Sequence, residues 1–127
     1  MPRETEAAAE VRMGPFKLVA MNRVYDDGVN LVFQPAEDYD PSGYAEFKVT
    51  LAEAEVFAVG CHYLAIVRPS DKREGWIVLS MKQDKSEVRI HLYLSSGGSL
   101  AWSVDVERSR TLSMARTYTV RFERLPE

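Results

Sequence analysis

Hydrophobic and polar residues alternate along much of the chain, which is the pattern of half-buried β-strands. The alternation is regular from Phe16 to Met21 and from Val29 to Gln34, and Asp27-Gly28 lies between these segments. Asp-Gly pairs tolerate the positive φ angles that tight connections between strands require. The pattern therefore predicts an N-terminal β-hairpin. A third strand is predicted from Tyr44 to Val49, with its odd-numbered residues facing inward.

Helical spacing replaces this alternation after Thr50. Thr50 and Glu53 have the spacing of a capping box, in which each side chain hydrogen-bonds a free backbone N–H at the start of a helix. Apolar residues follow at helical spacing, so we expect a mostly buried helix from Leu51 to about Val67 that ends before Pro69. Gly60 and the later β-branched residues also suit a second interpretation, a helix of about three turns followed by a strand.

The second half of the chain contains further alternating segments separated by polar turns. Asp105 to Arg116 lacks a firm period and is expected to form a loop or a short helical turn. The pattern as a whole predicts an α+β fold, in which a mainly antiparallel sheet of about seven strands packs on one central helix. The strands expected in this half are Trp76–Lys82, Glu87–Leu94, Leu100–Val104 and Thr117–Arg124.

The chain length of 127 residues fits a single domain. Residues 1–14 are expected to form a mobile N-terminal tail, because Met1 to Glu10 is rich in Glu and Ala and has no apolar period with which to pack. Residues 15–127 are expected to form one α+β domain. The strands before and after the helix are compatible with a divergent duplication, although no internal repeat is convincing in the sequence.

No segment is predicted to cross a membrane. The longest nearly apolar stretch, Val56–Val67, is too short to span a bilayer and is interrupted by His62. The first ten residues contain three glutamates and one arginine, which is unlike a secretory signal. Cys61 is the only cysteine and cannot form an internal disulfide, so we expect a cytoplasmic protein.

Charge is distributed unevenly along the chain, whose formal net charge is −3. Residues 1–64 contain five Lys or Arg against eleven Asp or Glu, whereas residues 65–127 contain eleven against eight. The second half is therefore locally basic within an acidic protein. Such asymmetry suggests a surface that faces a polyanion.

The segment Glu87–Leu94 carries the most informative pattern. Its even-numbered residues are apolar, so Arg89, His91 and Tyr93 should project together from the opposite face of the strand. Cations neutralise phosphates, and flat rings provide surfaces on which bases stack, so this combination suits single-stranded nucleic acid. The residues expected to bind nucleic acid are Lys17, Trp76, Lys82, Arg89, His91, Tyr93, Arg108, Arg110, Arg116 and Arg121.

The two tryptophans are expected to differ in burial. Trp102 shares its parity with Leu100 and should lie in the core, whereas Trp76 begins its strand beside a basic turn and can either pack inside or reach a partner.

Known catalytic and metal-binding patterns are not matched. Asp38 to Gly43 resembles the opening of a calcium loop, but Val49 stands where such a loop needs an acidic residue. Cys61 and His62 are neighbours whose side chains diverge, and one cysteine with two histidines does not complete a structural zinc site. There is no nucleotide-binding glycine motif and no serine-hydrolase motif. We expect no cofactor, no metal and no catalytic residue.

The order of elements resembles one family of nucleic-acid-binding proteins. Strands, then a helix opening with Thr50-Leu51-Ala52-Glu53-Ala54-Glu55, then strands with a basic and aromatic face, are similar to the Whirly and Pur type of single-stranded nucleic-acid-binding proteins. This resemblance covers about residues 15–124 as an order of elements, without a diagnostic motif. It implies curved antiparallel sheets that pack on helices and hold a nucleic-acid strand against the sheet.

These observations predict a non-enzymatic protein that binds single-stranded DNA or RNA with little sequence preference. Phe16–Met21 is apolar on both sides, so this strand should be central in the sheet or buried in a homodimer contact. The alternative is a protein-interaction module or a homo-oligomeric assembly domain that does not bind nucleic acid. A third hypothesis, a small-molecule site or enzyme, would depend on Cys61, His62 and His91.

Overall fold

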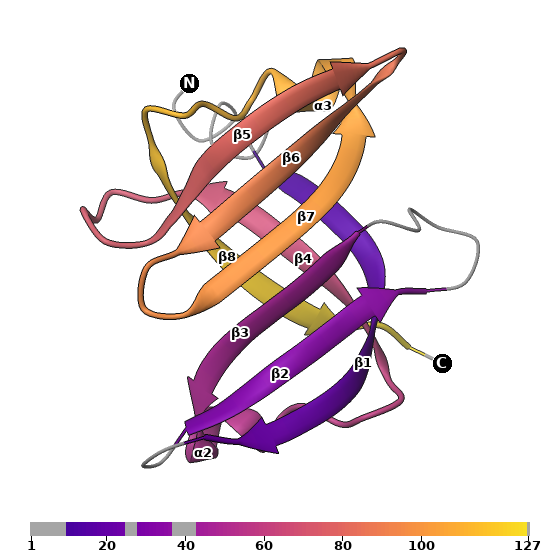
Figure 1. Cartoon of the computed structure of the whole chain (residues 1–127), viewed down its shortest axis with the longest axis vertical. Coiled ribbons are helices and arrows are strands. Elements are labelled where there is room, and N and C mark those ends of the chain that lie inside the picture. The colour runs from indigo at the N-terminus through magenta and orange to yellow at the C-terminus, as the bar shows by residue number, and fades with distance from the viewer. Residues whose placement is uncertain (1–9, 25–27, 37–42, 127) are drawn as a thin grey trace.

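The protein is a closed barrel of antiparallel strands (Figure 1). The computed structural model describes residues 10–24, 28–36 and 43–126. Within these residues, two helices of one turn each accompany eight strands. The elements are β1 (Val11–Arg23), β2 (Gly28–Pro35), β3 (Tyr44–Thr50), α2 (Leu51–Ala54), β4 (His62–Pro69), β5 (Trp76–Asp84), β6 (Glu87–Leu94), β7 (Gly98–Asp105), α3 (Val106–Ser109) and β8 (Thr117–Arg124).

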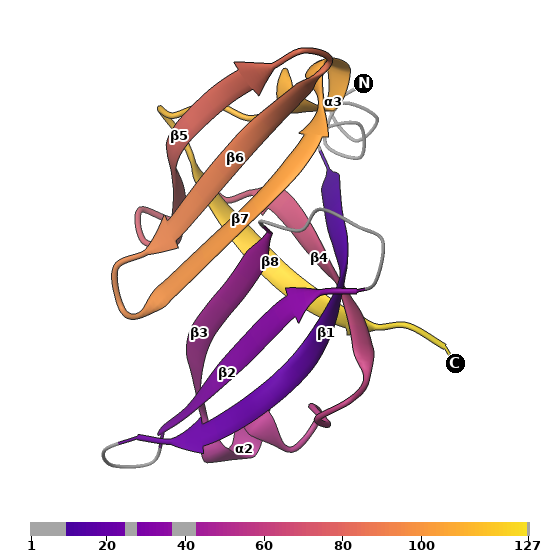
Figure 2. The ribbon, with the colours of Figure 1, turned by 45° about the vertical axis from the view of Figure 1, so that its right-hand side comes forward.

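The order of the strands around the barrel is β1-β2-β3-β7-β6-β5-β8-β4. Consecutive strands form two meanders, β1–β3 and β5–β7, which occupy the lower and upper parts of Figure 1. The meanders meet where β3 pairs with β7, and β4 pairs with β8 behind them (Figure 2). β1 is paired with β2 on one side and β4 on the other. Phe16 and Lys17 have partners on both neighbouring strands, whereas Ala20 and Met21 pair with β2 alone, so the central position predicted for Phe16–Met21 holds only for the first part of the segment.

The ring order is two-fold symmetric. If β1, β2, β3 and β4 are exchanged with β5, β6, β7 and β8, respectively, every strand keeps equivalent neighbours. The barrel therefore consists of two matching halves, β1-β2-β3-α2-β4 and β5-β6-β7-α3-β8. The residue pairing matches as well: Phe16 lies opposite Tyr63 in the first half, and Trp76 lies opposite Tyr118 in the second. The two halves therefore repeat one arrangement of elements, and the division between them falls after β4, not at the helix as the sequence suggested.

Irregular features recur at matching positions of the two halves. The pairing of β1 with β2 shifts at Val19, and the pairing of β5 with β6 shifts at Leu79. Thr50 caps α2, and Asp105 caps α3, each through its side-chain oxygen. The bulges and caps therefore belong to the repeated plan of the halves.

A buried tyrosine accepts a hydrogen bond from the loop that follows each short helix. The amide of Ala58 donates to the Tyr63 hydroxyl at 2.8 Å, and the amide of Ser113 donates to the Tyr118 hydroxyl at 2.7 Å. Both tyrosines are fully buried. Each therefore satisfies a loop amide that would otherwise lack a partner inside the protein.

Two glycines leave space for the two tryptophans inside the barrel. A Cβ on Gly43 would lie 2.4 Å from the Trp102 ring, and a Cβ on Gly98 would lie 2.7 Å from the Trp76 ring. These glycines occupy matching places just before or at the start of β3 and β7. Both tryptophans belong to the second half, and they pack against one glycine of each half, Gly43 of the first and Gly98 of the second.

The expected α+β fold with a central helix is wrong. The helix predicted from Leu51 to Val67 ends after one turn at Ala54, and β4 follows from His62. Gly60 adopts φ +95°, which no continuing helix allows. Tyr63, Ala65 and Val67 alternate inward as a strand requires, because both edges of β4 are paired in the barrel.

Several local predictions are confirmed. Thr50 and Glu53 form the capping box: the Thr50 amide donates to Glu53 Oε1 at 2.9 Å and the Glu53 amide donates to Thr50 Oγ1 at 3.1 Å. β6 and β8 have the predicted bounds, Glu87–Leu94 and Thr117–Arg124. A short helix, α3, lies within Asp105–Arg116.

β1 begins at Val11, so Val11 to Gly14 belong to the barrel and not to a tail. Glu10 holds this end in place by accepting hydrogen bonds from Arg12 Nε at 3.0 Å and Arg68 Nε at 2.7 Å. These hydrogen bonds hold the pKa of the Glu10 carboxyl below its ordinary value. Residues 1–9 lie outside the described part of the chain.

Neither α2 nor α3 approaches the length of a membrane-spanning segment, and no described helix is long and apolar enough to cross a bilayer.

Candidate nucleic-acid interface

The outward side chains of β5, β6 and β7 form one surface, which we call the β5–β7 face. On β6 the side chains of Val88, Ile90 and Leu92 are buried, whereas Arg89 and His91 are half-buried and Tyr93 is 40% exposed. The predicted parity of this strand is confirmed at these positions. Leu94, at the strand end, is half-buried. The predicted group Arg89, His91 and Tyr93 therefore points away from the core.

Cross-strand pairing arranges the β5–β7 face in rows. Lys82, Arg89 and Ser103 lie side by side, and the next row holds Ser80, His91 and Ala101. The row after that contains Ile77, Tyr93 and Ser99. The face thus changes from cationic to aromatic and apolar along its length.

Two cations stand next to each other on this face. Lys82 on β5 is the register partner of Arg89 on β6, and Arg89 Nη1 donates to Ser103 Oγ at 3.4 Å. Like charges in directly opposed positions repel. Predicted residues from two strands therefore meet here.

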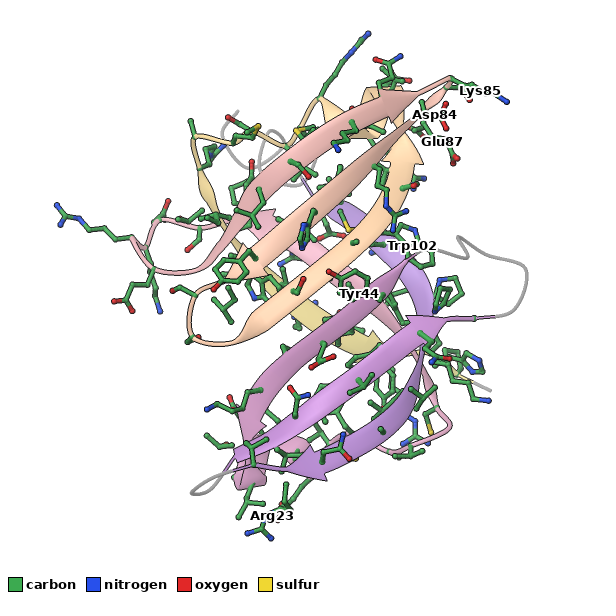
Figure 3. The ribbon with its side chains drawn as sticks, viewed as in Figure 1. Arg23, Tyr44, Asp84, Lys85, Glu87 and Trp102 are labelled. Atoms are coloured by element: carbon green, nitrogen blue, oxygen red, sulfur yellow. The ribbon has the colours of Figure 1, made fainter. Side chains whose placement is uncertain are left out.

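A row of carboxylates bounds the face at the β5–β6 hairpin. Asp84, Glu87 and Asp105 occupy adjacent register positions, and Figure 3 shows Asp84, Lys85 and Glu87 at the hairpin tip. A phosphate backbone is repelled by this end. A polyanion on the β5–β7 face is thus directed from the two cations toward the aromatic rows.

Tyr44 adds a second exposed ring from the neighbouring strand β3. Its side chain is 38% exposed and lies beside β7 (Figure 3). The Tyr44 hydroxyl lies 2.7 Å from Ser99 Oγ and 3.3 Å from His91 Nε2, and His91 Nε2 lies 2.8 Å from Ser99 Oγ. Three strands therefore contribute to one hydrogen-bonded cluster, which we call the Tyr44–His91–Ser99 cluster.

The sequence did not identify Tyr44 or Ser99 as site residues. The alternation of β3 puts Ala45 inward and Tyr44 outward, so the outward position of Tyr44 could be predicted from the sequence. Its proximity to His91 depends on the pairing of β3 with β7, which joins the two halves across a large separation in sequence. No local pattern reports such a pairing.

Trp76 lies in the core, contrary to its candidacy as a stacking surface. Its side chain is 6% exposed and packs edge-on against Phe47, with the ring centroids 6.2 Å apart. It shares inward parity with Val78, and the missing side chain at Gly98 provides the space for its ring. Trp102 is also buried, as predicted, and tilts against Phe16.

The other predicted cations are dispersed over the barrel. Lys17 lies on β1 opposite His62, and Arg121 on β8 is paired with Glu123. Arg108 on α3 pairs with Asp105 at 3.6 Å. Arg110 and Arg116 are exposed on the segment between α3 and β8. These five cations do not belong to the β5–β7 face.

The structure does not bring together the residues that a thiol catalyst or a metal site would need. Cys61 is buried in the core cluster, whereas His91 points outward from β6. Asp38 to Ser42, most of the calcium-like segment, lies outside the described residues. Among the residues that are described, no group of three or more His, Cys, Asp or Glu side chains could hold a metal ion.

A cavity of about 270 Å³ lies at the α3 end of the barrel. Three carboxylates line it, from Glu10, Asp105 and Glu107, together with the guanidinium of Arg108. Glu10 and Arg108 are already engaged in ion pairs. Its negative lining makes it unsuited to phosphate.

The outer face of β1–β3, which we call the β1–β3 face, provides an internal reference. The register aligns Asn30 with Arg89, Val32 with His91 and Gln34 with Tyr93. Asn22 likewise matches Lys82. At these four matching positions the β1–β3 face is neutral and has no ring, whereas its Lys17, Lys48 and Tyr44 match Ile77, Ser103 and Ser99 on the β5–β7 face.

Comparison of the chain with protein-family models, with curated proteins and with solved structures finds no match. The resemblance to the Whirly and Pur type proteins therefore stays a prediction.

Proposed function

We propose that this protein binds single-stranded DNA or RNA on the β5–β7 face, without enzymatic activity and with little sequence preference. The observation that carries the proposal is the difference between matching faces. One barrel plan presents Lys82, Arg89, His91 and Tyr93 on one side and neutral residues at the corresponding places on the other. Because the fold forms with either set, this chemistry is not required by the barrel.

Phosphate neutralisation and base stacking are the two parts of the mechanism. Lys82 and Arg89 face the phosphates, and binding there releases counterions, so affinity falls as salt rises. Tyr93 and Tyr44 are exposed enough to stack with bases, which contributes about 1–3 kcal/mol per base in proteins of this kind. Every base has a flat surface, so stacking gives little sequence preference.

Titration of the purified protein into a labelled oligothymidylate or oligouridylate, followed by fluorescence anisotropy, tests the proposal. Saturable binding that weakens strongly between about 50 and 200 mM salt is expected. The variant Tyr93→Ala should bind about tenfold more weakly, whereas its matched control on the other half, Gln34→Ala, should bind as the natural protein does. Absence of salt-sensitive binding contradicts the proposal.

A second candidate function, docking of another protein, is favoured by the apolar end of the same face. Ile77 lies directly opposite Tyr93, and Leu79 next to it is 45% exposed. A partner protein covering these side chains would bind with little dependence on salt. The salt series therefore separates the two candidates.

Assembly and compartment are parts of the same proposal. A homodimer would join two weak β5–β7 faces and raise the affinity for a long strand. Sedimentation velocity with and without oligonucleotide measures this. The single cysteine, Cys61, is buried, and the cytoplasm remains the compartment that we propose.

A further inference from the structure

The Tyr44–His91–Ser99 cluster has a composition that suits a phosphate group. It contains two hydroxyls and one imidazole from three different strands, all within 3.3 Å of one another. None of its members is fully buried. Lys82 and Arg89 lie in the adjoining row of the same face. A ligand oxygen can therefore reach the cluster from solvent.

The protons of the cluster decide whether it can donate to an anion. When His91 Nε2 carries no proton, it accepts from one hydroxyl, and the second hydroxyl donates to the first. Both hydroxyl protons are then used inside the cluster. When Nε2 is protonated, it donates to one hydroxyl, that hydroxyl donates to the other, and one O–H becomes free to point outward.

We propose that the Tyr44–His91–Ser99 cluster binds a phosphate oxygen and that protonation of His91 strengthens this binding. The inference rests on the proposed function, because the phosphate is assigned to the nucleic-acid backbone. Compared with the neutral tautomer that carries its proton on Nδ1, imidazolium adds a positive charge and releases one hydroxyl donor at the same time; compared with the Nε2–H tautomer, it adds the charge alone. Hydrogen bonds that involve charged groups are stronger than neutral ones, so the acidic form binds the anion more tightly.

Other charged and titratable groups surround His91. Arg89 and Tyr93 flank it on β6, Lys82 lies in the neighbouring row on β5, and Tyr44 and Glu46 face it from β3. β7 contributes only Ser99, Ala101 and Ser103 at the matching positions. Histidine is the side chain whose charge ordinarily changes between pH 5 and 8. Substitution of His91 therefore distinguishes its contribution from that of these neighbours.

The test measures oligonucleotide affinity by fluorescence anisotropy at about pH 5.5 and pH 8, at constant ionic strength. The natural protein should bind about tenfold more tightly at the lower pH. His91→Gln should remove this gain, and His62→Gln, the matched control at the other histidine, should keep it.

A second measurement identifies the occupant. Inorganic phosphate titrated at the lower pH should shift the NMR resonance of the His91 ring and should displace the oligonucleotide. If phosphate shifts that resonance without displacing the oligonucleotide, the backbone is not the occupant and the inference is wrong.

The outcomes separate the inference from the proposed function. Oligonucleotide binding with the same pH dependence in His91→Gln as in the natural protein overturns the inference and leaves the proposed function intact. No oligonucleotide binding at either pH overturns both. Circular dichroism of each variant establishes that the barrel is folded before its affinity is interpreted.

Discussion

The two halves of the barrel agree on the inside and differ on the outside. Tyr63 and Tyr118 are both buried and both accept a loop amide, and Gly43 and Gly98 both face a tryptophan. The outer residues at matching places differ in charge and in aromatic content. The difference separates what the fold requires from what the fold permits, because only the inner set recurs.

The pairing of the first strand of each half with its fourth strand, β1 with β4 and β5 with β8, also differs between the halves. β1 pairs with β4 through Val11–Met13 and Phe16–Lys17, and the loop before β4 adds bonds between Leu18 and the residues Gly60 and Cys61. β5 pairs with β8 at Trp76 and Ile77 alone. The half that carries the proposed binding face is therefore joined to its fourth strand by the shorter ladder.

Gly43→Ala and Gly98→Ala test the shared core most severely. Each added methyl would enter a tryptophan ring, so each variant should lose about 3 kcal/mol of unfolding free energy. Urea unfolding followed by tryptophan fluorescence measures the loss, and Ser80→Ala on the surface serves as the control. A large loss at one glycine and none at the other would show that the halves do not pack alike.

Tyr63→Phe and Tyr118→Phe sharpen the same comparison. Removing either hydroxyl leaves a loop amide without its partner, so both variants should lose about 2 kcal/mol. The exposed Tyr93→Phe should change stability by less than about 0.5 kcal/mol. Unequal losses of the two buried hydroxyls would break the equivalence of the loops that follow α2 and α3.

In Lys82→Asn, a cation of the β5–β7 face is replaced by asparagine, the residue type of Asn22 at the matching position of the first half. The slope of log affinity against log salt for an oligonucleotide should decrease in size by about one, since one phosphate contact is lost. Lys48→Ser, which places the second-half residue on the β1–β3 face, should leave the slope unchanged. Equal effects of both substitutions would mean that the charge of the whole barrel, and not one face, attracts the ligand.

Glu10→Gln tests the ion pairs that join β1 to β4, and it has the smallest expected effect. Glu10 bonds Arg12 on β1 and Arg68 on β4. The hydrogen bonds from Arg12 and Arg68 lower the pKa of Glu10 in the folded protein. The ionised carboxylate therefore stabilises the fold above its ordinary pKa of 4.5, and this contribution is lost as the pH falls through the lowered folded value.

Surface ion pairs of this kind contribute about 0.5 kcal/mol. The natural protein should exceed Glu10→Gln in unfolding free energy by about this amount at pH 7, and the difference should disappear in acid. A difference that persists below about pH 3 would assign the effect to packing.

The comparison also explains how far the sequence could predict the structure. Strict alternation fixed the bounds and inward set of β6, and the Thr50–Glu53 spacing located the start of α2. Both signals are local. The segment from Phe57 to Val67 misled because short apolar runs fit helix and strand alike, and the pairing of β4 with both β1 and β8 decides between them.

The candidate site was predictable to the same extent. The outward group on β6 followed from parity, whereas the burial of Trp76 depended on a glycine in a distant strand. The Tyr44–His91–Ser99 cluster depends on contacts between the halves. Residues placed by one strand could be predicted, and residues placed by the closure of the barrel could not.

Exchange of the face tests the central claim most directly. The triple variant Arg89→Asn, His91→Val, Tyr93→Gln gives β6 the outer residues of β2 and should leave the urea unfolding curve nearly unchanged. Its affinity for a single-stranded oligonucleotide at low salt should fall about 100-fold, from the lost phosphate and stacking contacts together. An oligonucleotide affinity equal to that of the natural protein, in a folded variant, would contradict the assignment of binding to the β5–β7 face.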